Sequence, residues 1–194
     1  MNNDFCHDLQ WSSNAFSRIV WPRVAAWCSG GELIVVEDKN SQMLDVCAGI
    51  DAWQVIREKS IVRGVATRVQ YDTGKPHYPY NTFTIRFSRP QSKTEFEKRT
   101  EAILGLSADG AIWPFLTIQA YLDADKKSLV SAAVVRTKDL YWYVDSKGVE
   151  TFAHVANKDG SSTFIVVPWD EMKEANVNVR VWTSEYDPNT THNG

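Results

Sequence analysis

Apolar residues near the start of the chain recur at steps of three and four, which is the spacing of one face of a helix. The pattern predicts an amphipathic helix that begins after the helix-capping residues Ser12 and Ser13. Pro22 lies inside it and predicts a kink or a split, and Gly30 and Gly31 predict its end. The apolar positions of this helix are Phe16, Ile19, Val20, Val24 and Trp27.

Short apolar runs and alternating runs fill much of the remaining chain and predict β-strands. The run at residues 32–37 is rich in β-branched residues and predicts a buried strand. Gly49 interrupts the run at residues 43–56, which predicts a bulge or the close approach of another segment. The other predicted strands are residues 61–71, 82–88, 114–122, 129–136, 140–144, 152–156, 162–167 and 178–183.

Two more helices are predicted beyond the first. Residues 92–95 match a capping box, and Phe96, Ile103 and Leu104 give the following helix an apolar side. Residues 169–175 predict a short helix. A helix, four successive strands, a helix and further strands favour an α+β fold, with helices flanking a mixed central β-sheet. We expect one domain over residues 1–184 and a disordered tail over residues 185–194.

Composition narrows the class of protein. The 194 residues are 43% hydrophobic and 23% charged, which is typical of soluble globular proteins. No apolar run approaches the roughly 18 residues of a membrane span, so we expect no membrane contact. The polar first ten residues do not resemble a secretory signal, and we expect a cytoplasmic protein with reduced cysteines. Eight tryptophans are more than a domain of this size readily buries, which favours a homo-oligomer.

Positive charge is concentrated in the middle of the chain, although the whole chain has a net charge of -3. Residues 61–100 contain eight basic and three acidic residues, a net charge of +5. Such a block either binds phosphate groups or forms an ordinary solvated surface. If it binds nucleic acid, the contacting residues would be Arg86, Arg89, Lys93, Lys98 and Arg99, together with Lys75 in a tyrosine-rich loop.

Catalytic motifs with fixed spacing are absent from the sequence: there is no nucleophile elbow, phosphate loop, dinucleotide fingerprint or zinc-type His-Glu-x-x-His. The remaining chemistry lies in Gly49-Ile50-Asp51 and in Arg68-Val69-Gln70 on the next predicted strand. In a hairpin of this kind, Asp51, Arg68 and Gln70 would face the same way. This arrangement resembles the PD-(D/E)xK nuclease superfamily, from the first helix through the Glu32 strand to Gln70.

The resemblance implies a restriction-endonuclease-like core and metal-dependent hydrolysis of DNA, in a nuclease of mobile-element, repair or defence type. Asp51 would be the principal ligand of Mg²⁺ or Mn²⁺, with Asp45 or Glu32 as the second. Gln70 would orient water and Arg68 would clamp a phosphate. The sequence departs from the family at two positions, because Arg68 replaces the acid and Gln70 replaces the lysine, and an arginine cannot ligate Mg²⁺.

Two other interpretations remain open. The degenerate acid-x-Lys motif favours a catalytically inert module on the same scaffold that binds nucleic acid or protein. The tryptophans and the basic block are also compatible with an oligomeric structural protein. Metal dependence separates the nuclease from the inert module, and salt dependence separates a phosphate-binding module from a structural protein.

Overall fold

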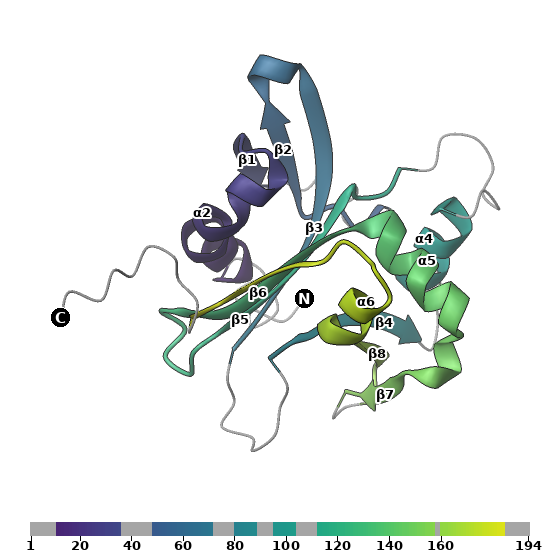
Figure 1. Cartoon of the computed structure of the whole chain (residues 1–194). Coiled ribbons are helices and arrows are strands. Elements are labelled where there is room, and N and C mark those ends of the chain that lie inside the picture. Colours follow the sequence, from purple (N-terminus) through teal and green to yellow (C-terminus); the bar gives the residue numbers. More distant parts are fainter. Residues whose placement is uncertain are drawn as a thin grey trace.

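Two β-sheets and several helices make up the computed structural model, which describes residues 11–35, 48–71, 80–88, 95–103, 112–157 and 160–184 (Figure 1). The larger sheet has the strand order β1-β2-β3-β5-β6-β9, and the smaller has the order β4-β8-β7. The strands are β1 (Glu32–Val35), β2 (Ala52–Ile56), β3 (Ile61–Tyr71), β4 (Thr82–Ser88), β5 (Leu116–Leu122), β6 (Leu129–Arg136), β7 (Ala153–Ala156), β8 (Thr163–Pro168) and β9 (Arg180–Thr183). The helical segments are η1 (Phe16–Val20), α2 (Trp21–Val24), η2 (Ala25–Cys28), η3 (Arg57–Lys59), α4 (Glu95–Ile103), α5 (Thr137–Lys147), η4 (Val149–Thr151) and α6 (Trp169–Glu174).

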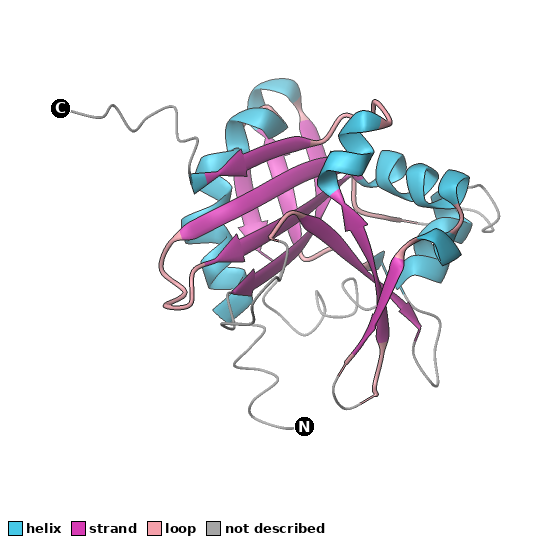
Figure 2. Cartoon of the chain, turned by 60° about the horizontal axis from the view of Figure 1, so that its bottom comes forward, coloured by secondary structure: helices cyan, strands magenta, loops and turns pink. Residues whose placement is uncertain are grey.

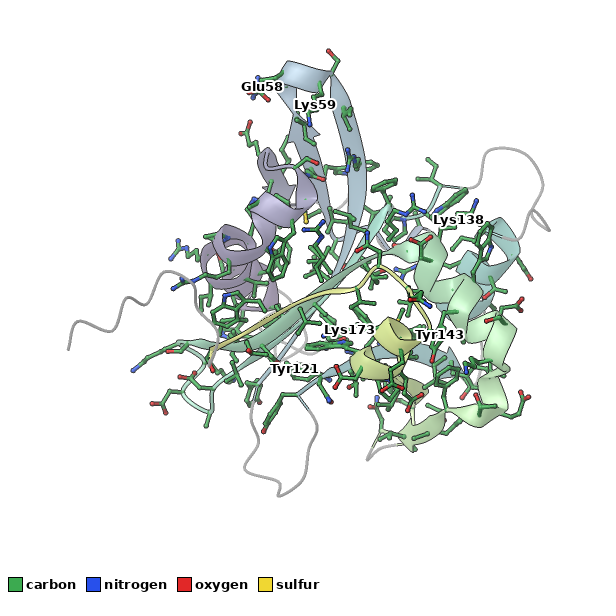
Figure 3. The ribbon with its side chains drawn as sticks, in the orientation of Figure 1. Glu58, Lys59, Tyr121, Lys138, Tyr143 and Lys173 are labelled. Carbon is green, nitrogen blue, oxygen red and sulfur yellow. The ribbon has the colours of Figure 1, made fainter. Side chains whose placement is uncertain are left out.

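The larger sheet is mixed. β1, β2 and β3 form an antiparallel meander, and the tip of the β2–β3 hairpin carries Glu58 and Lys59 (Figure 3). β3 then pairs with β5 in parallel, from Val65 opposite Leu116 to Tyr71 opposite Leu122. A parallel pair needs a crossover, and the chain makes it through β4 and α4. The predicted α+β class and mixed sheet are confirmed.

Each face of the larger sheet is covered by a different hydrophobic core. The N-terminal helical segment packs on one face, where Phe16 and Val20 meet Val65 and Ile118. The smaller sheet lies across the other face together with α4, α5 and α6 (Figure 2). Tyr121 of β5 is buried in this second core. Within the described residues, no helix is long and apolar enough to cross a membrane.

The first helix passes through Pro22 by changing its geometry. Proline lacks an N–H and its ring displaces the carbonyl four residues earlier. The turn before it is a π-helix, in which the Trp21 N–H donates to the Phe16 carbonyl. The segment continues as α2 and then as the 3-10 helix η2, and it ends where Ser29 takes a left-handed conformation with φ of 67°. The predicted interruption at Pro22 is therefore a change of helix type.

Two predictions of local structure are wrong. Residues 140–144 are not a strand, because α5 runs through them. Leu140, Tyr141, Tyr143 and Val144 are buried while Trp142 is exposed, which is one face of a helix and not an alternation. The strand at residues 32–37 is not buried either: β1 is at the edge of the sheet, its side chains are exposed or half-buried, and residues 36–37 lie outside the described ranges.

The predicted close approach at Gly49 is confirmed. Gly49 has φ of +63°, a conformation that L side chains rarely adopt. Arg99 of α4 donates from Nη2 to the Gly49 carbonyl over 2.7 Å, and a Cβ at Gly49 would collide with that guanidinium. The glycine thus joins α4 to the segment just before β2.

Cys28, at the end of η2, should make the free energy of unfolding decrease at alkaline pH. Burial raises the pKa of its thiol to about 11, an effect that Arg63 and Arg180 only partly oppose. In the unfolded chain the thiol has a pKa of about 8.5. The stabilisation that the buried neutral thiol provides is therefore complete below that pH and is lost as the pH rises towards 11. In a background with Cys6→Ser and Cys47→Ser, we expect the free energy of unfolding to fall more steeply between pH 8 and 10.5 than in a Cys28→Val variant. Equal slopes would contradict this assignment.

Candidate functional site

The strand register puts two predicted site residues on one face of the larger sheet. Val69 of β3 packs against the N-terminal helical segment, so Arg68 and Gln70 face the opposite way, towards the smaller sheet. Asp51 directly precedes Ala52, the first residue of β2.

Asp51 is bound to β3 by two hydrogen bonds. Its backbone N–H donates to the Val65 carbonyl over 3.0 Å. Its carboxylate oxygen Oδ2 accepts the backbone N–H of Thr67 over 2.5 Å. This second hydrogen bond holds a half-buried carboxylate against β3.

Gln119 of β5 connects the two sheets. It is 1% exposed, and its Nε2 donates to Oε1 of Gln70 over 3.1 Å. Its own Oε1 accepts the backbone N–H of Thr84 over 3.3 Å and the Thr84 hydroxyl over 3.2 Å. Because Thr84 belongs to β4, these bonds form a polar bridge from β3 through β5 to the smaller sheet.

Arg68 and Arg86 meet at one aromatic ring beside this bridge. The Arg68 guanidinium carbon lies 4.3 Å from the centre of the Phe164 ring, and that of Arg86 lies 5.5 Å from it. Arg86 is on β4 and Phe164 is its partner on β8, so the two cations come from different sheets. We call Asp51, Arg68, Gln70, Thr84, Arg86 and Gln119 the inter-sheet polar cluster.

Two members of the cluster, Gln119 and Thr84, are not among the predicted site residues. In the sequence, Gln119 is one polar position of the predicted strand at residues 114–122, where it could either line a cleft or belong to an ordinary polar face, and Thr84 lies in the predicted strand at residues 82–88. Nothing in the sequence pairs them, because β4 and β5 belong to different sheets. The signal for Gln119 was an amide on a mostly apolar strand, where burial requires a hydrogen-bond partner.

The structure does not bring Glu32 to Asp51. Glu32 pairs with Val55 at the far end of β2 and accepts a hydrogen bond from Arg57 over 2.8 Å at the surface. Val55 is four positions along the chain from Asp51, which is about 13 Å in an extended chain. Asp45 lies outside the described residues. Within the described part of the chain, no group of three His, Cys, Asp or Glu side chains is arranged to hold a metal.

The predicted basic residues are not all at the surface. Arg99 turns inward, where Nη2 binds the Gly49 carbonyl and Nη1 lies 3.5 Å from the Tyr141 hydroxyl. Arg86 joins the inter-sheet polar cluster. Lys98 is part of α4, and three other predicted contacts, Lys75, Arg89 and Lys93, lie outside the described residues.

Tyr71, the last residue of β3, faces the opposite side of the sheet from Gln70, on the side of Trp11 and the N-terminal helical segment. It follows Gln70 directly and is 39% exposed. Nζ of Lys126 lies 3.8 Å from the Tyr71 ring centre and 4.7 Å from that of Trp11, and the two rings meet edge to face. An exposed aromatic ring beside an ammonium group is a common surface for nucleic-acid bases.

Comparison with known proteins adds no relative. No protein-family model matches the chain, and searches of the curated proteins and of the solved structures give no match. The chemistry of the inter-sheet polar cluster is therefore the basis for a function.

Proposed function

We propose that the protein is a metal-dependent DNA endonuclease on a PD-(D/E)xK-like scaffold and that the inter-sheet polar cluster is its site. The observation that supports this most is the hydrogen bond from the Thr67 N–H to Asp51, which holds the carboxylate against β3, the strand that carries Arg68 and Gln70. The side chains of Asp51, Arg68 and Gln70 are all half-buried, so the site is covered but not sealed.

The order of the elements also supports the proposed scaffold. A helical segment leads into an antiparallel meander that carries Asp51 and Gln70, and α4 follows as the next helix. These are the elements on which the resemblance rests. β5 then returns parallel to β3 and contributes Gln119 to the cluster.

Different residues of the cluster would bind the phosphate and the metal. Arg68 and Arg86 offer planar guanidinium groups suited to phosphate oxygens. Asp51 supplies a hard carboxylate oxygen, oriented by the Thr67 N–H. A bound Mg²⁺ or Mn²⁺ would supply activated water and charge neutralisation at the phosphodiester. Of the two candidates for the second carboxylate, Glu32 is at the other end of β2 and Asp45 lies outside the described residues.

Cleavage of plasmid and single-stranded DNA with Mg²⁺ or Mn²⁺ tests the proposal. We expect wild-type cleavage to stop with EDTA and to fall to background in Asp51→Asn. Asparagine keeps an oxygen that can accept the Thr67 N–H, so the fold should survive. Glu32→Gln is the matched control and should cut like wild type, because Glu32 is remote from the cluster. Wild-type protein that does not cut, or an active Asp51→Asn, would overturn the proposal.

An inert nucleic-acid-binding module is the second candidate. It is favoured by the composition of the cluster, in which two guanidinium groups accompany the single carboxylate of Asp51. Such a protein would bind DNA without metal, and its affinity would fall steeply as salt increases. Salt-sensitive binding together with no cleavage under any metal condition would select this candidate.

A further inference from the structure

The hydrogen bonds around Gln119 determine which way its amide points. The backbone N–H of Thr84 can only donate, so the atom of Gln119 that faces it must be the carbonyl oxygen Oε1. The Gln119 amide nitrogen then faces Gln70 and must donate to it. The reverse orientation would set an NH₂ group against an N–H inside a buried site and leave both donors without an acceptor.

The orientation of Gln119 determines that of Gln70. Because Gln119 donates, Gln70 must turn its oxygen Oε1 towards Gln119. The Gln70 nitrogen is then the end of the amide that is directed away from this bond. Gln70 is half-buried, so this NH₂ group can meet a ligand that the fully buried Gln119 cannot reach. Gln70 therefore presents hydrogen-bond donors, whereas a metal ligand must present an oxygen.

The neighbouring side chains are donors too. Arg68 is two residues from Gln70 on the same face of β3, and Arg86 is two residues from Thr84 on β4. Two residues along a strand span about 7 Å. Long side chains at positions this far apart can both contact one phosphate group. The two guanidinium groups converge on the ring of Phe164, and each carries five N–H donors.

We infer that Gln70, Arg68 and Arg86 form an anion receptor for a backbone phosphate of DNA, and that Gln70 does not ligate a metal. The inference rests on the proposed function and refines it, because it names the group that this part of the cluster binds. Gln119 is a positioning residue that sets the orientation of the Gln70 amide. Any metal chemistry is then restricted to the Asp51 side of the cluster.

Gln70→Glu distinguishes a donor from a metal ligand. Glutamate has the same size and still accepts the Gln119 N–H, but it replaces the NH₂ group with a charged oxygen. We expect a labelled DNA oligonucleotide, titrated in EDTA, to bind about 10- to 100-fold more weakly than to wild type. A metal-ligand role predicts the opposite: unchanged binding in EDTA, with tighter Mg²⁺ or Mn²⁺ binding by the variant. That result would overturn the inference.

Two further measurements test whether Arg68 binds the anion and whether the anion is a phosphate. Arg68→Gln should lower the dependence of affinity on salt by about one phosphate contact, whereas Gln70→Glu should leave more of that dependence in place. Inorganic phosphate should compete with the oligonucleotide on wild type and lose this effect in Gln70→Glu. If phosphate competes equally with both proteins, the anion binds elsewhere and the receptor is wrong.

Failure of this inference is distinguishable from failure of the proposed function. The oligonucleotide titration contains EDTA and requires no cleavage. A wild-type protein that binds DNA through Gln70 but never cuts it refutes the endonuclease and keeps the receptor. A protein that cuts DNA with Asp51-dependent activity, but binds it equally well as Gln70→Glu, keeps the endonuclease and refutes the receptor.

Discussion

Gly49→Ala should lower the free energy of unfolding by about 3 kcal/mol. Two effects add. An alanine in the left-handed conformation costs about 1–2 kcal/mol. Its Cβ would also collide with the Arg99 guanidinium, which must then give up its hydrogen bond to the Gly49 carbonyl, and a hydrogen bond to a charged group contributes about 1.5–3 kcal/mol. Chemical denaturation followed by circular dichroism measures the change.

Gly160→Ala is the matched control for the backbone effect. Gly160 has φ of +68°, close to that of Gly49, but no atom of the described residues lies within 4 Å of the position that an alanine Cβ would take there. This variant should therefore lose only about 1 kcal/mol. In an Arg99→Ala background, Gly49→Ala should also cost no more than Gly160→Ala, because the collision is removed. Equal losses at the two glycines in the wild-type background would show that the Arg99 contact contributes nothing.

Trp169→Ala should be the most damaging single truncation of the second core. Trp169 is 1% exposed at the start of α6, and its ring lies 5.8 Å from that of Phe83 and 5.9 Å from that of Tyr121. It therefore joins β4, β5 and α6. Truncating a buried tryptophan to alanine costs about 3–5 kcal/mol, which corresponds to a fall in Tm of about 10 °C for a chain of this length. A thermal unfolding curve checks this.

Trp142→Ala is the comparison for this substitution. Trp142 is also on a helix, α5, but it is 48% exposed, and Nζ of Lys138 lies 4.1 Å from the centre of its ring. Its removal should cost about 1 kcal/mol or less, because an exposed cation–π contact contributes about 0.5–1 kcal/mol. A Tm that falls equally in both variants would contradict the assignment of Trp169 to the core.

The alternation of apolar and polar residues was the most reliable guide to the strands of the fold. β3 and β4 have the bounds that their sequence pattern predicts, because each strand has well-defined turn residues or a change of pattern at both ends. The same reasoning failed at residues 140–144, where the apolar run is too short to separate a strand from a helix. In the structure, β6 ends at Arg136 and α5 runs from there to Gly148, so residues 140–144 lie inside a helix.

The candidate site could be predicted only within one hairpin. Asp51, Arg68 and Gln70 lie on or beside the β2–β3 hairpin, which local sequence determines. Arg86, Thr84 and Gln119 join them through the packing of two sheets, and no local pattern specifies which side chains meet across such an interface. The inward turn of Arg99 depends on the same long-range packing, so a basic residue in the sequence could not be assigned to the surface in advance.

The contribution of β8 has a consequence for the chain during synthesis. Phe164, the ring on which Arg68 and Arg86 meet, is near the C-terminal end of the described chain, more than 90 residues after Arg68. A ribosome adds roughly 5–20 residues per second, so a nascent chain lacks this ring for several seconds after β3 has emerged. The arrangement of Arg68 and Arg86 on Phe164 can form only after β8 has been synthesised, so chains terminated before β8 should lack the proposed phosphate-binding half of the cluster.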